Sequence, residues 1–148
     1  MNVIIRKITL DELSLVTQVL NHIPEFDAIF YETTLRKRLE KPESIILIAE
    51  FEGKPVGCKV AYNRYFDGSI YSWLGGVLPD YRCRGIAKEL LNRLEIEAER
   101  KLFLSIRMKT RNKHIDMLGF ALKNGFQICG YKGMDNPSES RIELIKTL

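Results

Sequence analysis

The feature that most constrains this fold is a strand, a tight turn and a helix that follow one another across residues 71–98. The apolar strand pattern ends at Pro79, because proline has no backbone N–H to donate within a central strand. The turn that follows carries three cations around Gly85, where a helical pattern begins. Free N–H groups at a helix N-terminus favour anions, and glycine lets a ligand approach the backbone. Residues 71–98 therefore predict a site for a phosphate-bearing molecule.

Three strand patterns lead into this turn. Residues 44–51 are almost continuously apolar, which fits a strand covered on both faces. Residues 56–62 alternate in polarity, and Asp67-Gly68 is a hairpin signal of the type I′ turn, with positive φ at both central positions. Residues 69–77 then return as the next strand. We expect three antiparallel strands in series, the last with a bulge at Gly75-Gly76, because glycines weaken a strand.

The helix after the turn is amphipathic from Gly85 to about residue 100, and residues 102–108 alternate as a further strand. A strand–helix–strand unit of this length makes a right-handed crossover, so its two strands should be parallel. The remaining patterns are a first strand at 3–8, a helix from a capping box at 9–12 that ends before Pro24, helices at 33–40 and 115–122, and closing strands at 126–131 and 141–145.

Composition is typical of one globular domain, residues 1–148, with 45% hydrophobic and 28% charged residues. No apolar run approaches the roughly 20 residues that span a bilayer, and the first residues lack the order of a secretory signal. We therefore expect a cytoplasmic protein with no membrane partner. The net charge of +4 is spread along the chain rather than gathered among aromatic residues, so no nucleic-acid partner is expected.

The cysteines predict neither a metal site nor a disulfide framework. Cys58, Cys83 and Cys129 are odd in number and have no spacing typical of metal ligands. Cys58 and Cys129 lie in strand patterns, where we expect small buried residues.

Residues 82–87, Arg-Cys-Arg-Gly-Ile-Ala, resemble the acetyl-CoA pyrophosphate motif Q/R-x-x-G-x-G/A of the GCN5-related N-acetyltransferases, the GNAT family. Residues 76–81 also look like the strand that precedes this motif in the family. The resemblance implies an α/β (α+β) fold of the acyl-CoA N-acyltransferase type: a mixed, mostly antiparallel sheet flanked by helices, with a splayed parallel strand pair at the cofactor site. It implies acetyl-CoA as the acetyl donor and no metal.

The resemblance also implies which residues hold the donor. Pantetheine would pair with the main chain of the strand, the pyrophosphate would lie on the turn and the helix N-terminus, and a further contact would come from the late helix. The implied set is Gly76, Val77, Leu78, Arg82, Cys83, Arg84, Gly85, Ile86, Ala87, Lys88 and Asn112. From the pattern alone, Asn112 is equally a candidate N-cap of the late helix.

The implied activity is an acetyl-CoA-dependent N-acetyltransferase that moves an acetyl group to a primary amine by direct transfer in a ternary complex. The acceptor remains open between a small molecule, an amino acid, a peptide and a protein, and the protein is either a monomer or a homodimer. Many family members carry a tyrosine acid four residues before the Gly-Phe of the late helix, but here that position is Ala121. A non-catalytic CoA-binding or regulatory module of the same fold is therefore the alternative.

Two further groups are candidates for the chemistry. Tyr71 and Ser72 are the polar residues of the strand before the motif, Tyr71 as proton donor and Ser72 as holder of a water. The segment that contains Phe26, Phe30, Tyr31 and Glu32 mixes aromatic and acidic side chains, which attract a cationic acceptor. Alternatively, its phenylalanines anchor a helix to the core and its acids are solvated.

Overall fold

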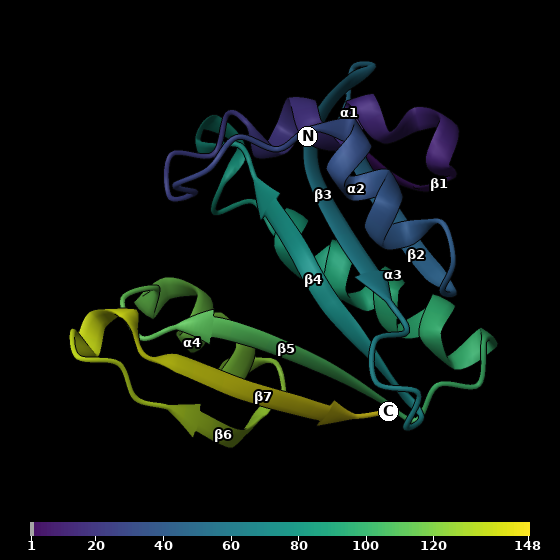
Figure 1. Ribbon diagram of the computed structural model, residues 1–148. Coiled ribbons are helices and arrows are strands. Elements are labelled where there is room, and N and C mark those ends of the chain that lie inside the picture. Colours follow the sequence, from purple (N-terminus) through teal and green to yellow (C-terminus); the bar gives the residue numbers. More distant parts are fainter. Residues whose placement is uncertain (1) are drawn as a thin grey trace.

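The computed structural model describes residues 2–148 and has one seven-stranded sheet with helices on both faces (Figure 1). The strands are β1 (Val3–Ile8), β2 (Ser44–Phe51), β3 (Lys54–Tyr62), β4 (Ser69–Val77), β5 (Ser105–Arg111), β6 (Gln127–Lys132) and β7 (Arg141–Thr147). The helices are α1 (Leu13–Leu20), α2 (Glu32–Leu39), α3 (Ile86–Arg100) and α4 (Ile115–Lys123), with short 3-10 turns at Leu10–Glu12, Pro79–Tyr81 and Pro137–Glu139.

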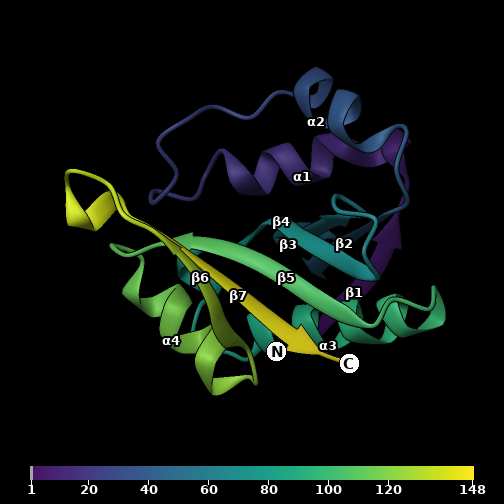
Figure 2. The ribbon, with the colours of Figure 1, turned by 60° about the horizontal axis from the view of Figure 1, so that its bottom comes forward.

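The strand order is β1-β2-β3-β4-β5-β7-β6, and within residues 2–148 the pair β4–β5 is the parallel one. The mixed sheet and the parallel pair confirm the expected fold class. Figure 2 shows α1 and α2 on one face of the sheet and α3 and α4 on the other. Each face has its own apolar core, because the strands alternate side chains between the two helix layers. No helix of residues 2–148 has the length and apolar character to cross a bilayer.

Strands β4 and β5 are paired along only part of their length. Ser69–Ser72 pair with residues 105–108, and beyond Ser72 the two strands diverge, as Figure 1 shows. The bulge of β4 lies at Trp73, because Ser72 opposes Ala61 while Leu74 opposes Val60. The expected bulge at Gly75-Gly76 is therefore wrong. Both glycines stay in register with β3.

Gly76 instead lets the side chain of Ile23 approach the backbone of β4 closely. A Cβ at this position would overlap the Cδ1 atom of Ile23, which lies in the segment between α1 and α2. Only a residue without a side chain lets this segment pack against β4. The glycine thus fixes how closely the α1–α2 segment covers the strand that leads into the turn.

Three local expectations are corrected. The β3–β4 connection spans residues 63–68, with positive φ at Phe66 and Gly68 but not at Asp67, so it is not a two-residue type I′ turn. Strand β5 begins at Ser105 rather than at Leu102, whose φ is +65° and whose side chain is exposed. Cys129 is exposed, since it lies at the bulge of the edge strand β6.

The capping box is only half formed. Thr9 caps the 3-10 turn by accepting a hydrogen bond from the Asp11 N–H, but Glu12 pairs with Arg6 instead of reaching back to the Thr9 backbone. Helix α1 therefore starts at Leu13, after the 3-10 turn.

Candidate functional site

The divergence of β4 from β5 leaves one edge of β4 without a strand partner beyond Ser72. On the other edge, the Leu78 N–H donates to Val56 O of β3 at 2.8 Å. Because successive residues of a strand direct their N–H and C=O groups to opposite edges, those of Val77 point into the gap toward β5. Of the predicted main-chain contacts Gly76, Val77 and Leu78, Val77 therefore presents its N–H to the gap, while its C=O already accepts a hydrogen bond from Arg82.

The turn before α3 is built around left-handed backbone. Gly85 has φ +81° and is the N-cap of α3, and Cys83 has φ +61°. Gly85 has no side chain with which to cap the helix, and a Cβ at this position would meet no atom of residues 2–148 within 4 Å. The N–H groups of the first turn, which include those of Ile86, Ala87 and Lys88, thus begin beside open space and carry the positive end of the helix dipole. This arrangement fits a phosphate group.

Arg82 fastens the turn to its surroundings. Its Nε donates to Val77 O at 3.0 Å, and its two terminal nitrogens donate to the Glu25 carboxylate at 2.7 and 2.9 Å. These hydrogen bonds hold the pKa of Glu25 below its ordinary value. Arg82 therefore links the α1–α2 segment, the end of β4 and the turn, while Cys83 and Arg84 beside it are exposed.

Lys88 and Asn112 both contact neighbouring segments. The Lys88 ammonium donates to the side-chain oxygen of Asn124, at the end of α4, and thereby joins α3 to α4. The Asn112 amide donates to Pro137 O at 3.3 Å, and the N-cap of α4 is His114. The alternative of Asn112 as the N-cap is therefore wrong.

Tyr71 and Ser72 lie on opposite faces of β4, so the structure does not bring the two catalytic candidates together. Tyr71 packs with the core under α1 and α2, and burial raises the pKa of its hydroxyl. A proton donor must remain protonated at neutral pH, and Tyr71 meets this condition. Ser72 is buried beside Met108 of β5.

The candidate acceptor residues of the aromatic and acidic segment are likewise not brought together, because two pack on the core and two are exposed. Phe26 and Phe30 meet edge to face at 5.2 Å and pack on the core beneath α1 and α2, and a Cβ at Gly76 would lie 3.9 Å from the Phe26 ring. Tyr31 and Glu32 are exposed at the start of α2. The phenylalanines thus anchor the segment beside the candidate site, and Phe26 is the member of the predicted set that reaches β4.

The sequence patterns missed a group of residues on the α1 and α2 face, which we name the arginine–aromatic cluster. Three arginines from different elements stack on aromatic rings at centroid distances of 4.9 to 5.8 Å. Its members are Arg38, Tyr62, Arg64, Tyr65, Tyr71, Trp73 and Arg107. They come from α2, the end of β3, the β3–β4 connection, β4 and β5, so no periodicity joins them. The one local signal is the run Arg64-Tyr65-Phe66 in an expected loop.

Comparison with known proteins agrees with this geometry. The family model described as Acetyltransferase (GNAT) family matches residues 9–126. Ard1 from Thermoplasma volcanium has a TM-score of 0.82 at 16% identity, with 100% of this chain and 99% of that chain covered. A ribosomal-protein-alanine N-acetyltransferase from Brucella melitensis has a TM-score of 0.78 at 21% identity, with 98% and 99% covered.

A GNAT family acetyltransferase from Elizabethkingia anophelis, whose structure has acetyl-CoA bound, has a TM-score of 0.75 at 19% identity, and 99% of each chain is covered. These identities show a shared fold. The family model spans most of this chain, from before α1 to the start of β6. The chain therefore belongs to the GNAT family of acetyltransferases.

Proposed function

We propose that this protein is an acetyl-CoA-dependent N-acetyltransferase that transfers acetyl directly to a primary amine. The observation that carries the proposal is the opening of the β4–β5 pair directly before a glycine turn and an uncapped helix N-terminus. This combination offers main-chain groups for an amide-containing chain and a positive helix end for its diphosphate. Crystals of related acetyltransferases with acetyl-CoA bound support the same donor.

In the proposed complex, the first turn of α3 with Gly85, Ile86, Ala87 and Lys88 faces the diphosphate, and Arg84 beside it adds charge. The edge of β4 at Val77 pairs with pantetheine, and the Val77 N–H polarises the thioester carbonyl as an oxyanion hole does. Arg82 positions the turn through Val77 O and Glu25 rather than pairing only with the donor.

The thioester supplies an activated acetyl group. The amine nitrogen bonds to the acetyl carbon, the carbon–sulfur bond breaks, and the electron pair leaves on sulfur. The amine loses a proton to water or a water chain, and the thiolate gains one. Tyr71 is the proposed proton donor, since its raised pKa keeps it protonated and Ala121 has no acidic group to offer. Ser72 and Asn112 remain proposed contacts to water and donor.

Isothermal titration with acetyl-CoA tests the donor site. The wild-type protein should bind at micromolar concentration, and Gly85→Asp should abolish binding because it adds a negative charge beside the diphosphate and strains a backbone with φ +81°. Gly53→Asp is the matched control, since Gly53 in the β2–β3 turn has φ +77° and equally open space for a side chain. Unchanged affinity in Gly85→Asp would reject the site.

A second candidate is a CoA-binding module without turnover. The observation that favours it is the complete burial of Ala121 in the core beneath α3, at the position where the resemblance expects an acid. Release of free thiol with a panel of amines separates the two candidates. A blank across the panel, with acetyl-CoA binding intact, would favour the module.

A further inference from the structure

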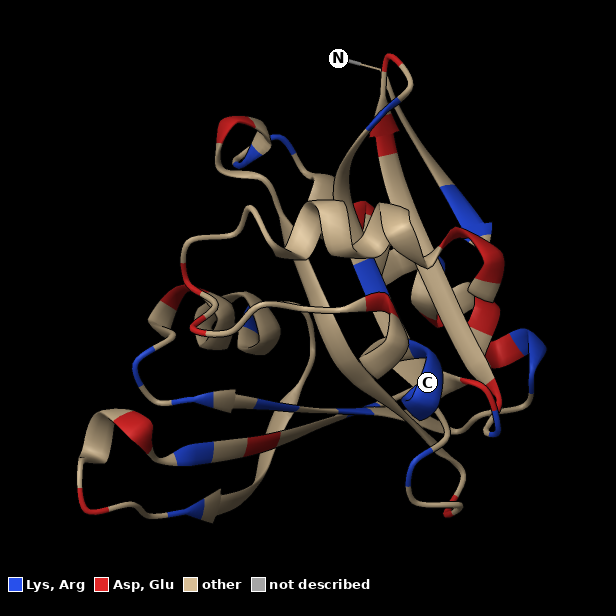
Figure 3. Ribbon diagram, turned by 45° about the horizontal axis from the view of Figure 1, so that its top comes forward, with Lys and Arg blue, Asp and Glu red and all other residues tan. Residues whose placement is uncertain are grey.

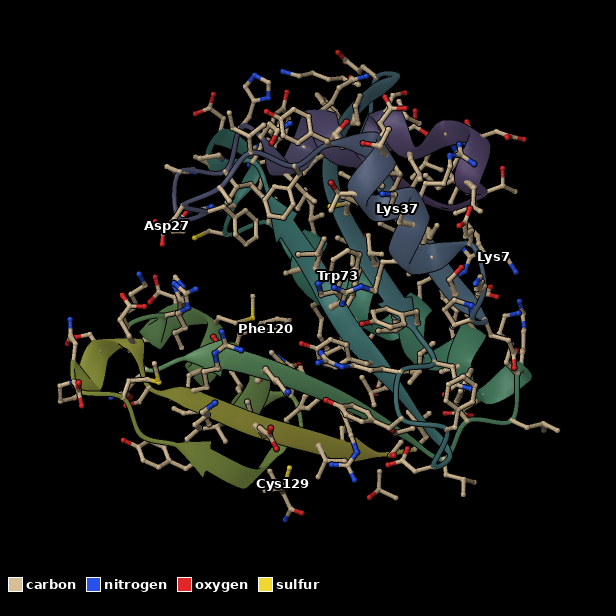
Figure 4. The ribbon with its side chains drawn as sticks, in the orientation of Figure 1. Lys7, Asp27, Lys37, Trp73, Phe120 and Cys129 are labelled. Atoms are coloured by element: carbon tan, nitrogen blue, oxygen red, sulfur yellow. The ribbon has the colours of Figure 1, made fainter. Side chains whose placement is uncertain are left out.

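The arginine–aromatic cluster lies where β4 and β5 separate. Tyr71 and Arg107 are partners in the parallel register, one pair before the last, and Trp73 is the bulged residue just beyond it. Tyr71 belongs to the core beneath α1 and α2, which places the cluster on the face opposite to α3. Figure 4 shows Trp73 on the β4 side of the gap and Phe120 near β5. If the diphosphate of the donor lies at the N-terminus of α3, the cluster lies on the opposite face of the sheet.

The cluster has more positive than negative charge. Arg107 lies 3.4 Å from Asp67, but its buried Nε has no hydrogen-bond partner among residues 2–148. Arg38 donates to the Tyr62 hydroxyl at 2.8 Å, and neither Arg38 nor Arg64 has a carboxylate within 4.0 Å in the described chain. Two guanidinium groups therefore lack a counter-ion.

Stacking holds these guanidinium groups without using their donors. The Arg38 group lies 4.9 Å from the Trp73 ring centroid, and the Arg64 group lies 4.9 Å from that of Tyr71. A ring covers the flat face of a guanidinium, while the N–H groups point outward in its plane. Stacking therefore leaves N–H groups at the edges of both guanidinium groups for charge-assisted hydrogen bonds to an anion.

The surroundings of the cluster add room for a ligand. An open cavity of about 510 Å³ adjoins it, lined by Tyr62 and Arg64 of the cluster and by one further cation, Lys41, and one carboxylate, Glu43. This volume falls within the range of small-molecule sites. Figure 3 shows both Lys or Arg and Glu positions on the strands beyond β4, where Lys109, Arg111 and Lys146 pair with carboxylates.

We propose that the acceptor is a small amine that also carries a carboxylate or phosphate, and that Arg38, Arg64 and Arg107 bind this anionic group. The inference rests on the proposed acetyl transfer, because the donor approaches from the α3 face and leaves the cluster face to the acceptor. The anion would take the place of the missing counter-ions, while the amine of the same molecule points toward the gap beyond Trp73. An acceptor of this kind differs from the cationic one that the acidic α1–α2 segment suggested.

Calorimetric binding to the full chain saturated with CoA tests this acceptor class without relying on turnover. Two matched pairs are titrated: β-alanine against β-alaninamide, and phosphoethanolamine against ethanolamine. We expect the member that carries the carboxylate or phosphate to bind on the order of 10-fold more tightly in at least one pair, as one charge-assisted contact provides. The pair that responds identifies the anion as carboxylate or phosphate.

Arg64→Gln should remove most of that preference and leave the binding of the member without the anionic group unchanged, since Arg64 lies in a surface connection and makes no ion pair in residues 2–148. Lys37→Gln is the matched control, because Lys37 is an exposed cation on α2 beside Arg38 (Figure 4). Equal binding within both pairs, or an unchanged preference in Arg64→Gln, would overturn the inference. Failure of acetyl-CoA itself to bind would instead reject the proposed donor site, so the two failures are distinguishable.

Discussion

Residues with little chemistry of their own set the geometry around the gap in the sheet. Gly85 supplies the left-handed backbone that starts α3, and Gly76 admits Ile23 against β4. Ala121 fills a core position with a methyl group. At the two glycines the absence of a side chain is the functional property, because each one leaves space that a neighbouring group or a ligand uses.

Lys59 is a half-buried lysine within the sheet. It lies on β3 opposite Leu47 and Gly75, and it forms no ion pair within residues 2–148. Burial lowers the pKa of its ammonium group from 10.5 to about 8. The folded state therefore binds this proton less tightly than the unfolded state, and the penalty is fully present below about pH 8.

Lys59→Met should consequently raise the free energy of unfolding at pH 7 by about 1 to 3 kcal/mol. The gain should shrink as the pH rises from 8 toward 10.5, since the wild-type lysine then becomes neutral in both states. Urea unfolding at pH 7 and pH 10 measures both values. Lys37→Met, at an exposed lysine, should show no such pH-dependent difference. A Lys59→Met gain that is equal at the two pH values would contradict the burial argument.

At the scale of elements, the sequence predicted the order of strands and helices and the turn before α3, because each depends on local periodicity or on glycine and proline. It misplaced the bulge of β4, since alternation reveals that a strand has two faces but not which residue is extra. It extended β5 into Leu102 and Leu104, which continue the alternation although the first has positive φ and both are exposed. The arginine–aromatic cluster depends on tertiary contacts between distant segments, which no local pattern reports.

Helix α3 is joined to β1 by a buried carboxylate that the helical pattern also did not single out. Glu97 is 2% exposed and binds Lys7 at 3.0 Å, Arg93 at 3.1 Å and Arg100 at 3.2 Å. Burial alone would raise the pKa of Glu97, but the hydrogen bonds from Lys7 and Arg93 outweigh it and leave the pKa lowered. The carboxylate therefore stabilises the fold at neutral pH.

Glu97→Gln should lower the free energy of unfolding at pH 7 by about 1 to 3 kcal/mol, because the three cations lose their shared acceptor. The difference from wild type should be full above the ordinary pKa of 4.5 and should disappear as the pH falls through the lowered pKa of the folded state. Thermal unfolding between pH 7 and pH 3 follows this change. Glu99→Gln, an exposed position on the same helix, is the control. A constant deficit across that range would show that the charge of Glu97 is not the cause.

For the molecule as a whole, two kinds of contact connect the halves of the sheet. Where β4 and β5 are still paired, from Ser69 to Ser72, four residue pairs join them next to the core that includes Ile106. Where the two strands have separated, Asp27 of the α1–α2 segment, labelled in Figure 4, lies across the gap. Its carboxylate is 3.4 Å from both Arg111 and Lys113. The Asp27 carboxylate is 70% exposed, so water screens its ion pairs. The apolar core rather than the ion pairs should therefore hold the halves together.

Two substitutions separate these contributions. Ile106→Ala removes a fully buried side chain and should cost about 2 to 5 kcal/mol of unfolding free energy, through lost burial and the cavity left behind. Asp27→Asn should cost less than about 1 kcal/mol, because an exposed ion pair contributes little. Equilibrium urea unfolding of both variants in the same buffer provides the comparison. A cost for Asp27→Asn as large as that for Ile106→Ala would mean that the charges across the gap between β4 and β5, and not the core beneath α3, keep this gap at its width.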